Sequence, residues 1–325
     1  MGAFILRRIA VAIPVLIGVT LLAYLLVDLA PGDPVTALID PVTRAELGAE
    51  WVELRKEQLG LNDPAPVRYL LWLREIARGN LGYSVISGQS VAEQIGARLG
   101  PTVLLMGTSL LLGTVVGVAI GVLSAVRQYS PLDYTATVFG FLAVSTPSFF
   151  LGLGLVYLFS VRWRILPSSG MQTLGGDGSS GDLLRHMILP VAVLAAAQAP
   201  LIMRYARSTM LEVMHQDYVT TARAKGVQER VVLLGHAFRN ALIPLITVVG
   251  LSLPELLSGA VITETIFQWP GMGLLAVRAV AARDYPLILG TILVTATMVL
   301  VSNLLADLLY GAVDPRIRLR QDRGR

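Results

Sequence analysis

The stretch from Asp217 to Pro244, DYVTTARAKGVQERVVLLGHAFRNALIP, is a charged loop between two apolar segments that are each long enough to cross a bilayer. A loop of this length and charge acts either as a topological anchor or as a docking surface for a soluble partner. Composition alone favours the anchor. The basic residues in and just before the loop are Arg204, Arg207, Arg223, Lys225, Arg230 and Arg239.

The first part of this loop has the end signals of a short helix. Asp217 suits a helix N-terminus, Lys225 suits the last turn, and Gly226 suits the position after the end, where a left-handed backbone is common. The pattern therefore predicts a helix at Tyr218–Lys225 that Gly226 terminates. Apolar residues then recur at helical spacing and predict an amphipathic helix leading into the next span: Val227, Val231, Leu234, Phe238 and Leu242.

The composition is that of an integral membrane protein. Of the 325 residues, 54% are hydrophobic and 15% are charged, and the mean hydropathy is +0.66, whereas a soluble protein needs a more polar surface. The absence of cysteine excludes disulfides, thiolate zinc sites and cysteine nucleophiles. We expect an all-α fold with six transmembrane helices, at about Ile9–Leu29, Leu99–Val126, Tyr134–Val161, His186–Met203, Ala241–Ile262 and Tyr285–Leu309.

Basic residues near the span ends predict the orientation. With six spans, the N-terminus, the loop after the second span, the charged loop and the arginine-rich C-terminus share one side, which the positive-inside rule makes cytoplasmic. Both termini are then cytoplasmic. The expected regions are a first transmembrane helix at 1–30, an extracytoplasmic insertion at 31–98, a five-helix core at 99–312 that includes a cytoplasmic loop at 204–240, and a basic cytoplasmic tail at 313–325.

Three glycines in the second span repeat every four residues and so share one face of the helix. Gly113, Gly117 and Gly121 allow a neighbouring backbone to approach closely. That neighbour is either another helix of this chain or a helix of a second subunit. Small residues at this spacing are common in membrane helices, so packing within the chain is the more ordinary explanation.

One carboxylate falls deep within a predicted span. Glu255 lies about 14 residues into the fifth span, beside Pro254 and just before Ser258. A carboxylate at that depth needs a partner or a water-filled cavity. Glu255 and Ser258 are therefore candidates for lining a translocation pathway. The alternative is that the Glu255 carboxyl satisfies backbone donors that are freed near the proline kink.

At the charged loop the sequence resembles the EAA loop of ABC-importer permeases, in the form found in the peptide-permease family (the oligopeptide, dipeptide and nickel group). Further segments resemble the B-type permease of that family, and the likeness runs nearly from end to end. The glutamate that names the motif is absent, since Thr220, Thr221 and Ala222 stand there, and the motif's proline is displaced to Pro244; both departures are normal for the peptide branch. The segments are TARAKG (221–226), HAFRNALIP (236–244), GNLGYSV (79–85), TPSFFLG (146–152), LPSSGM (166–171), WPGMG (269–273), DPRIR (314–318) and the N-terminal LRRIAVAIPVLIGVTLLAYLLVDLAPGDP.

The resemblance implies a type I ABC-importer permease fold, with a first helix and a five-helix core, in a bacterial cytoplasmic membrane. Such a chain binds no cofactor or metal itself and pairs with a homologous C-type permease, two cytoplasmic ATPase subunits that bind ATP and magnesium, and an extracytoplasmic substrate-binding protein. Di- and oligopeptides are the family's default substrates; nickel complexes, glutathione and haem also occur. The loop at 204–240 would then couple to an ATPase subunit through Asp217, Thr221, Ala222, Arg223, Ala224, Lys225 and Gly226.

Two other classes of protein compete with this interpretation. A membrane-embedded enzyme is disfavoured because the sequence has no HExxH, no GxSxG and no paired aspartates in its spans. A secondary transporter would not need a coupling loop. The two lysines, Lys56 and Lys225, lie outside any Walker A pattern, so the energy from ATP must come from partner chains. Nothing in the sequence points to nucleic acid.

Overall fold

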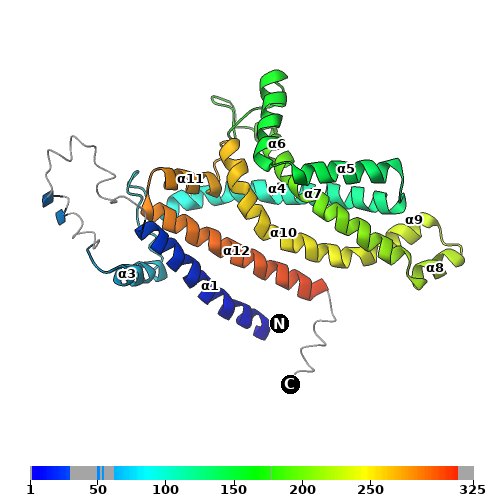
Figure 1. The fold of residues 1–325 in the computed structure, drawn as a ribbon, viewed down its shortest axis with the longest axis horizontal. Helices are drawn as coiled ribbons and strands as arrows, with labels where there is room; N and C mark the ends of the chain where they lie inside the picture. Colours follow the sequence, from blue (N-terminus) through cyan, green and yellow to red (C-terminus); the bar gives the residue numbers. More distant parts are fainter. Residues whose placement is uncertain (1, 30–49, 52, 55–61, 177, 314–325) are drawn as a thin grey trace. The chain divides into compact units, whose positions relative to one another are not determined.

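The computed structural model describes residues 2–29, 50–51, 53–54, 62–176 and 178–313, and it describes their side chains except at 2–4, 243, 251, 253, 255–259 and 309–313. Over these residues the protein is helical and has no strand (Figure 1). Four helices are long and apolar enough to cross a membrane, and two bent pairs of helices raise the number to six if each pair forms one span. The all-α membrane fold predicted from the sequence is therefore confirmed, with between four and six spans.

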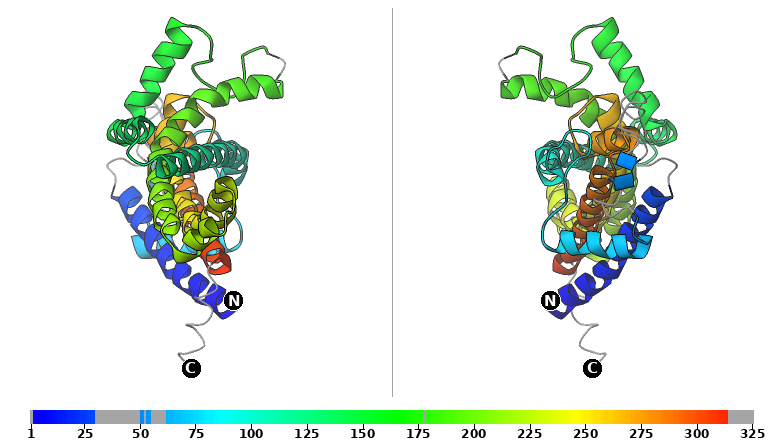
Figure 2. Two further views of the ribbon diagram at one scale, coloured as in Figure 1. Left: turned by 90° about the vertical axis from the view of Figure 1, so that its right-hand side faces the viewer. Right: turned by 90° about the vertical axis from the view of Figure 1, so that its left-hand side faces the viewer.

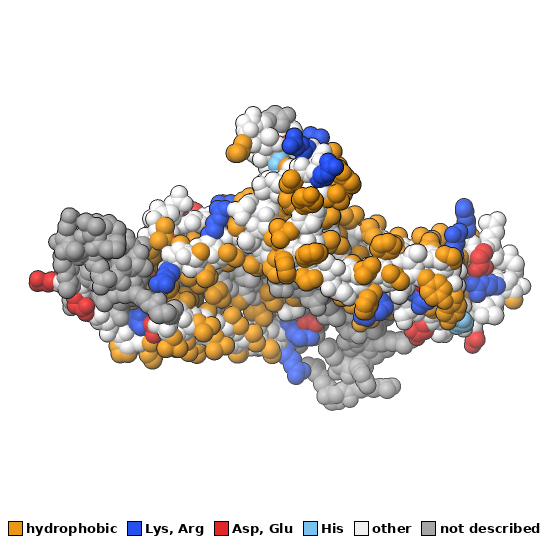
Figure 3. Space-filling view, turned by 45° about the horizontal axis from the view of Figure 1, so that its top comes forward, with side chains coloured by type: hydrophobic (Ala, Val, Ile, Leu, Met, Phe, Trp, Pro, Cys, Tyr) orange, Lys and Arg blue, Asp and Glu red, His pale blue; other side chains and the backbone are white. Residues whose placement is uncertain are grey.

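The surface also has the character of a membrane protein. Large apolar side chains are exposed on many helices, among them Phe141 at 73% and Phe150 at 66% of their full exposure. Hydrophobic side chains cover much of the face drawn in Figure 3. Apolar surface of this extent is unfavourable in water and is favourable against lipid.

The chain divides into two compact units. The first comprises Met1–Pro101 and Pro270–Leu300, and the second comprises Thr102–Trp269 and Val301–Arg325. The first unit contains α1 (Gly2–Asp28), α3 (Ala65–Ala77), the beginning of α4 (Val91–Val126), α11 (Met272–Ala281) and most of α12 (Tyr285–Val313).

Within the first unit, α3 packs beside α1 (Figure 2). The hydroxyl of Tyr69 donates to the carbonyl of Ile17 at 3.1 Å and lies 3.0 Å from the Thr20 hydroxyl. α3 lies in the region predicted as an insertion at 31–98, of which residues 31–49, 52 and 55–61 lie outside the described ones. Apolar side chains from α4, α11 and α12 form the core of this unit: Val91, Ile95, Met272, Leu275, Ala279, Leu287 and Ile288.

The second unit is built around α7. This 35-residue helix (Ser180–Met214) packs against α10 (Arg239–Ile266) and α5 (Pro131–Ser145). The hydroxyl of Ser179 caps its N-terminus by accepting a hydrogen bond from the amide of Asp182 at 3.3 Å. The remaining elements are α6 (Ser148–Leu155), the π-helical turn η2 (Val156–Arg162), α8 (Asp217–Ala224), α9 (Glu229–Val231) and the π-helical turn η3 (Val232–Phe238).

The predicted third span, Tyr134–Val161, is not one straight helix. It breaks after Ser145, and the two helical parts, Pro131–Ser145 and Ser148–Arg162, meet at 103° (Figure 1). The cause is Pro147, which has no amide hydrogen to continue the ladder and disfavours helical geometry at the residue before it. Thr146 is accordingly extended, with φ of −88° and ψ of 120°.

A smaller bend lies in the path leading into the predicted fifth span. The helical path from Glu229 to Gly250 turns by 45° where Pro244 enters α10. The helix expected after Gly226 thus forms, although its middle part, η3, is π-helical. α10 then continues to Ile266, four residues beyond the predicted end of the span at Ile262.

Candidate functional site

α8 is the short helix that the charged loop predicts. Its observed bounds, Asp217–Ala224, agree with the prediction to within one residue. Gly226 has a φ of 75°, and its amide donates to the carbonyl of Arg223 at 2.9 Å. A left-handed residue directly after the last turn confirms the predicted termination at Gly226.

One face of α8 is buried and holds the helix in place. Val219 is completely buried and Ala222 is nearly so, and both pack against Val232 at the start of η3. The amide of Val227 also donates to the carbonyl of Ala222 at 3.3 Å. α8 and α9 therefore lie together beyond the end of α7 (Figure 1).

The opposite face of α8 is exposed. Of the residues expected to couple to an ATPase, Ala222 points inward and helps to brace the helix. The exposed ones form a small polar surface that ends at the glycine turn: Asp217, Thr221, Arg223, Ala224, Lys225 and Gly226.

Arg223 and Glu229 close the turn around Gly226. The guanidinium donates to both carboxylate oxygens of Glu229, with the shortest distance, from Nη2 to Oε1, at 2.8 Å. The hydrogen bonds to Glu229 raise the pKa of the Arg223 guanidinium above its usual value. Sequence reasoning did not single out Glu229, although its spacing of six residues across a predicted glycine turn is a signal that could have found it.

A second ion pair joins the end of α7 to the start of α5. Arg207 Nε donates to Oδ1 of Asp133 and Nη2 donates to Oδ2, each at 2.8 Å. Asp133 also accepts from the amide of Tyr129 at 3.0 Å, which holds the left-handed turn before α5. The Asp133 side chain is 5% exposed and that of Arg207 is 28% exposed. α7 carries this pair two turns before it ends beside α8.

The described carboxylate deepest inside the second unit is Glu264, which sequence reasoning missed. Its side chain is completely buried, and the hydroxyl of Thr102 in α4 donates to Oε1 at 2.7 Å. The amide of Trp269 donates to the Glu264 carbonyl at 2.9 Å as the chain leaves α10. An ionisable side chain this deep in an apolar helical protein is a functional-site candidate. The predicted span ends at Ile262, two residues before Glu264, so Glu264 falls just outside it.

The predicted pathway residues, Glu255 and Ser258, belong to α10, but their side chains lie outside the described ones. Their role in lining a pathway therefore stays a prediction. In the parts of the chain that the structure describes, no group of three or more acidic or histidine side chains is placed to hold a metal ion.

The three glycines of α4 face α7 of the same chain. A Cβ on Gly113 would lie 3.4 Å from the carbonyl oxygen of Ala195, which is ordinary contact, but one on Gly117 would lie 2.7 Å from that of Ala199. A Cβ on Gly121 would collide with the carbonyl of Met203 and lie 2.7 Å from the Ala206 Cβ. The helices can therefore pack this closely only because the two later positions lack side chains.

Several apolar helices long enough to cross a membrane, with a short, braced and partly exposed helix between two of them, define a multi-span membrane protein. The model of the family described as "binding-protein-dependent transport system inner membrane component" matches residues 117–319, and the model of that family's N-terminal region matches residues 1–106. The chain belongs to this family.

Relatives that align over nearly the whole chain support this family assignment. The oligopeptide transport system permease protein AppB of Bacillus subtilis is 43% identical over 318 residues, which cover 98% of this chain and 99% of AppB. The dipeptide transport system permease protein DppB of Escherichia coli K12 is 40% identical over 341 aligned positions, covering 97% and 98% of the two chains. The di/tripeptide transport system permease protein DppB of Pseudomonas aeruginosa is 39% identical, covering 98% and 99%.

Proposed function

We propose that this protein is the B-type permease subunit of an ATP-binding-cassette importer and forms half of the translocation pathway for di- and oligopeptides. The observation that carries the proposal is α8, a short helix with one buried face and one exposed polar face, placed directly after the long apolar helix α7. In this role α8 is the coupling helix, and its exposed residues contact an ATPase subunit.

The proposed arrangement in the membrane is a type I permease fold with six spans and both termini cytoplasmic. It counts each bent helix pair as one span, which agrees with the upper of the two possible span numbers. α8 then lies on the cytoplasmic side with the other basic loops, and the region at 31–98 lies outside. The membrane is the bacterial cytoplasmic membrane.

The proposed partners are a homologous C-type permease, two cytoplasmic ATPase subunits and an extracytoplasmic binding protein. ATP and magnesium are bound by the ATPase subunits, and this chain has no catalytic role of its own. The names of AppB and of both DppB proteins support peptides as the substrate class. The binding protein selects among peptides before they reach the permease.

The test is reconstitution in proteoliposomes. With the second permease, both ATPases and a binding protein, ATP hydrolysis should rise when a di- or oligopeptide loads the binding protein, and labelled peptide should accumulate inside. The isolated chain should neither hydrolyse ATP nor concentrate peptide in response to a proton gradient. Gradient-driven uptake by the chain alone would identify a secondary transporter and overturn the proposal.

A further inference from the structure

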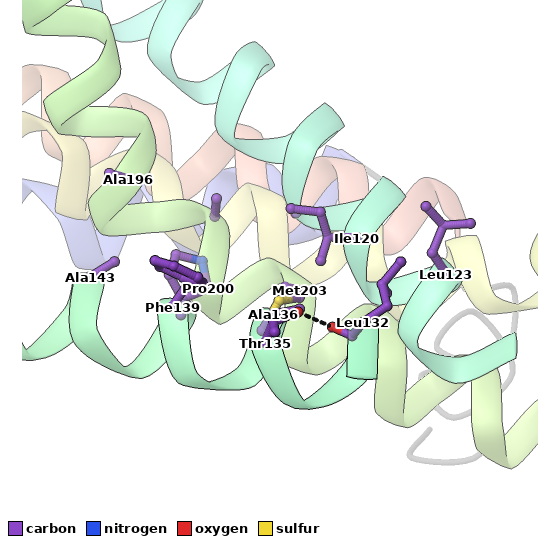
Figure 4. A pocket seen from close by; sticks show the side chains of 13 residues that line it. Ile120, Leu123, Leu132, Thr135, Ala136, Phe139, Ala143, Ala196, Pro200 and Met203 are labelled. Atoms are coloured by element: carbon purple, nitrogen blue, oxygen red, sulfur yellow. Dashed lines mark hydrogen bonds between the residues drawn. The ribbon is translucent and has the colours of Figure 1, made fainter. Parts of the chain in front are cut away.

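A groove of about 470 Å³ lies between α4, α5 and α7 in the second unit (Figure 4). Its volume is in the usual range of small-molecule sites, about 300–1,000 Å³. All three helices belong to candidate membrane spans or bent pairs. The groove therefore opens where the neighbouring medium is lipid or another membrane helix.

Small residues on two of the helices leave room for the groove between larger apolar side chains. Ala136, Gly140 and Ala143 of α5 face Ala196 and Ala199 of α7. The hydroxyl among the lining side chains, that of Thr135, already donates to the carbonyl of Leu132 at 3.0 Å (Figure 4). The walls thus offer a ligand shape and apolar contact and no unsatisfied side-chain donor.

One end of the groove is flanked by basic residues. Arg127 follows Leu123 by one helical turn, and Arg204 follows Pro200 by one helical turn; Leu123 and Pro200 both line the groove. Arg127 and Arg204 are exposed, and no ion pair of either is found among the residues that the structure describes. Arg207, at the same end, is already neutralised by Asp133. The Arg204 guanidinium lies over the ring of Tyr205, 5.9 Å from its centroid, and two positive charges without a described anionic partner thus follow lining residues of an apolar groove.

We propose that this groove binds an acyl chain of an anionic phospholipid whose phosphate is held by Arg127 and Arg204. The apolar groove fits the acyl chain of such a lipid, and the arginines at its end fit the anionic headgroup. The basic end is also the end that the topology predicts to be cytoplasmic, so the lipid belongs to the inner leaflet.

A helix of the partner permease is the competing occupant, and it fits less well. A helix with its side chains is about 10–12 Å across, whereas an acyl chain is narrow and flexible enough to follow a slot between three helices. A close-packed apolar helix over this end would also bury two arginines without anionic partners, which is unfavourable in a membrane. A phosphate compensates those charges directly.

The test uses the full chain in phosphatidylcholine nanodiscs that contain a trace of phosphatidylglycerol with a photoreactive diazirine on its acyl chain. Cross-links are located by mass spectrometry, and the same probe on phosphatidylcholine measures contact with bulk lipid. We expect the phosphatidylglycerol probe to label the lining segments of α5 and α7 much more strongly than the phosphatidylcholine probe does. Equal labelling by the two probes would overturn the proposal, because it would show lipid contact without recognition of the headgroup.

Two variants separate the chain-binding and headgroup-binding parts of the site. Ala143→Phe fills the groove and should reduce labelling there, whereas Val144→Phe adds the same ring at the next position, which is 64% exposed and not part of the lining. Arg127→Gln with Arg204→Gln changes two exposed side chains outside the groove lining and, apart from the contact of Arg204 with the Tyr205 ring, leaves the described packing in place. It should lower phosphatidylglycerol labelling by roughly tenfold or more, because each basic residue strengthens binding to an anionic lipid surface by about fivefold.

The paired arginine variant keeps the proposal testable if Ala143→Phe fails to fold, and size-exclusion chromatography shows whether it does. Unchanged phosphatidylglycerol labelling in the arginine variant would refute the headgroup assignment.

A last comparison adds the C-type permease to the labelling experiment. If the second subunit abolishes labelling of the groove in the parent, the groove is a subunit interface and the lipid proposal fails. Labelling that persists supports a lipid site. The readout is labelling and not transport, so the lipid proposal can fail while the proposed function holds, and the reverse.

Discussion

Arg207 and Asp133, which are 74 residues apart in the sequence, form a bidentate ion pair with both nitrogen–oxygen distances at 2.8 Å. The pair ties α7 to the turn that begins α5. The two side chains differ in burial, since Asp133 is nearly enclosed and Arg207 is partly open to its surroundings. This difference predicts unequal effects when either partner is removed.

Arg207→Ala should destabilise the protein by about 3 kcal/mol, because it leaves a buried carboxylate without its partner. Asp133→Asn should cost less, since the arginine that remains can reach solvent or lipid headgroups. Thermal unfolding in nanodiscs measures both, and Arg162→Ala, at an exposed arginine, is the control. Equal losses from the two variants, or a loss no larger than that of the control, would show that the pair contributes little.

Gly226 should tolerate asparagine but not valine. Its φ of 75° strains a β-branched residue by roughly 1–2 kcal/mol, and nothing lies within 4 Å of the position that a Cβ would take. The effect therefore comes from backbone conformation alone, and asparagine adopts that conformation readily. We expect Gly226→Val to insert and pair with the second permease but to weaken ATPase binding, measured by co-purification. Normal binding in Gly226→Val would mean that the turn does not position α8.

The Arg223–Glu229 pair allows a charge-exchange experiment. Arg223→Glu places two carboxylates together, and it should weaken coupling of ATP hydrolysis to transport. The double variant Arg223→Glu/Glu229→Arg restores an ion pair of the opposite orientation. If Arg223 also contacts the ATPase, the double variant should remain uncoupled. Full recovery would show that Arg223 serves to close the turn and that the docking contact lies elsewhere on α8.

Alanine at the α4 glycines should produce a graded loss of stability. Gly117→Ala and Gly121→Ala overpack the contact with α7 and should cost about 1–3 kcal/mol. Gly113→Ala should be nearly neutral, as should Gly107→Ala, where the added Cβ meets nothing within 4 Å. The measurement is the melting temperature of the isolated chain. Normal stability of the isolated chain with a defect only in subunit pairing would instead place the glycines at an interface between subunits.

Glu264 and Glu255 should differ in what their loss affects. Glu264→Leu removes the acceptor of the buried Thr102 hydroxyl, so we expect lower stability and yield, with Glu264→Gln milder. Glu255→Leu should lower transport while the complex still assembles. Transport normalised to assembled complex separates the two. A Glu255→Leu variant that fails to assemble would assign that residue to folding rather than to the pathway.

The sequence predicted best what depends on neighbouring residues. Gly226 ends α8 because a left-handed residue and its flanking cap are local features, and the apolar spans follow from their length and composition. The break at Pro147 was also within reach, since the predicted third span was long and contained a proline. The contacts of Arg207 with Asp133 and of Thr102 with Glu264 could not be predicted from the sequence, because only the packing of the helices brings these residues together.

The length of α7 has a mechanical consequence. Its 35 residues extend over about 52 Å, while the hydrocarbon core of a bilayer is about 30 Å thick, so the helix must project well beyond the core. The end of α7 that carries the Arg207–Asp133 pair and leads to α8 therefore lies outside the hydrocarbon core if the opposite end is embedded in it. Pro190 and Pro200 each remove an amide donor from the hydrogen-bond ladder of α7, so a change in the direction of this long helix is easiest at those two positions.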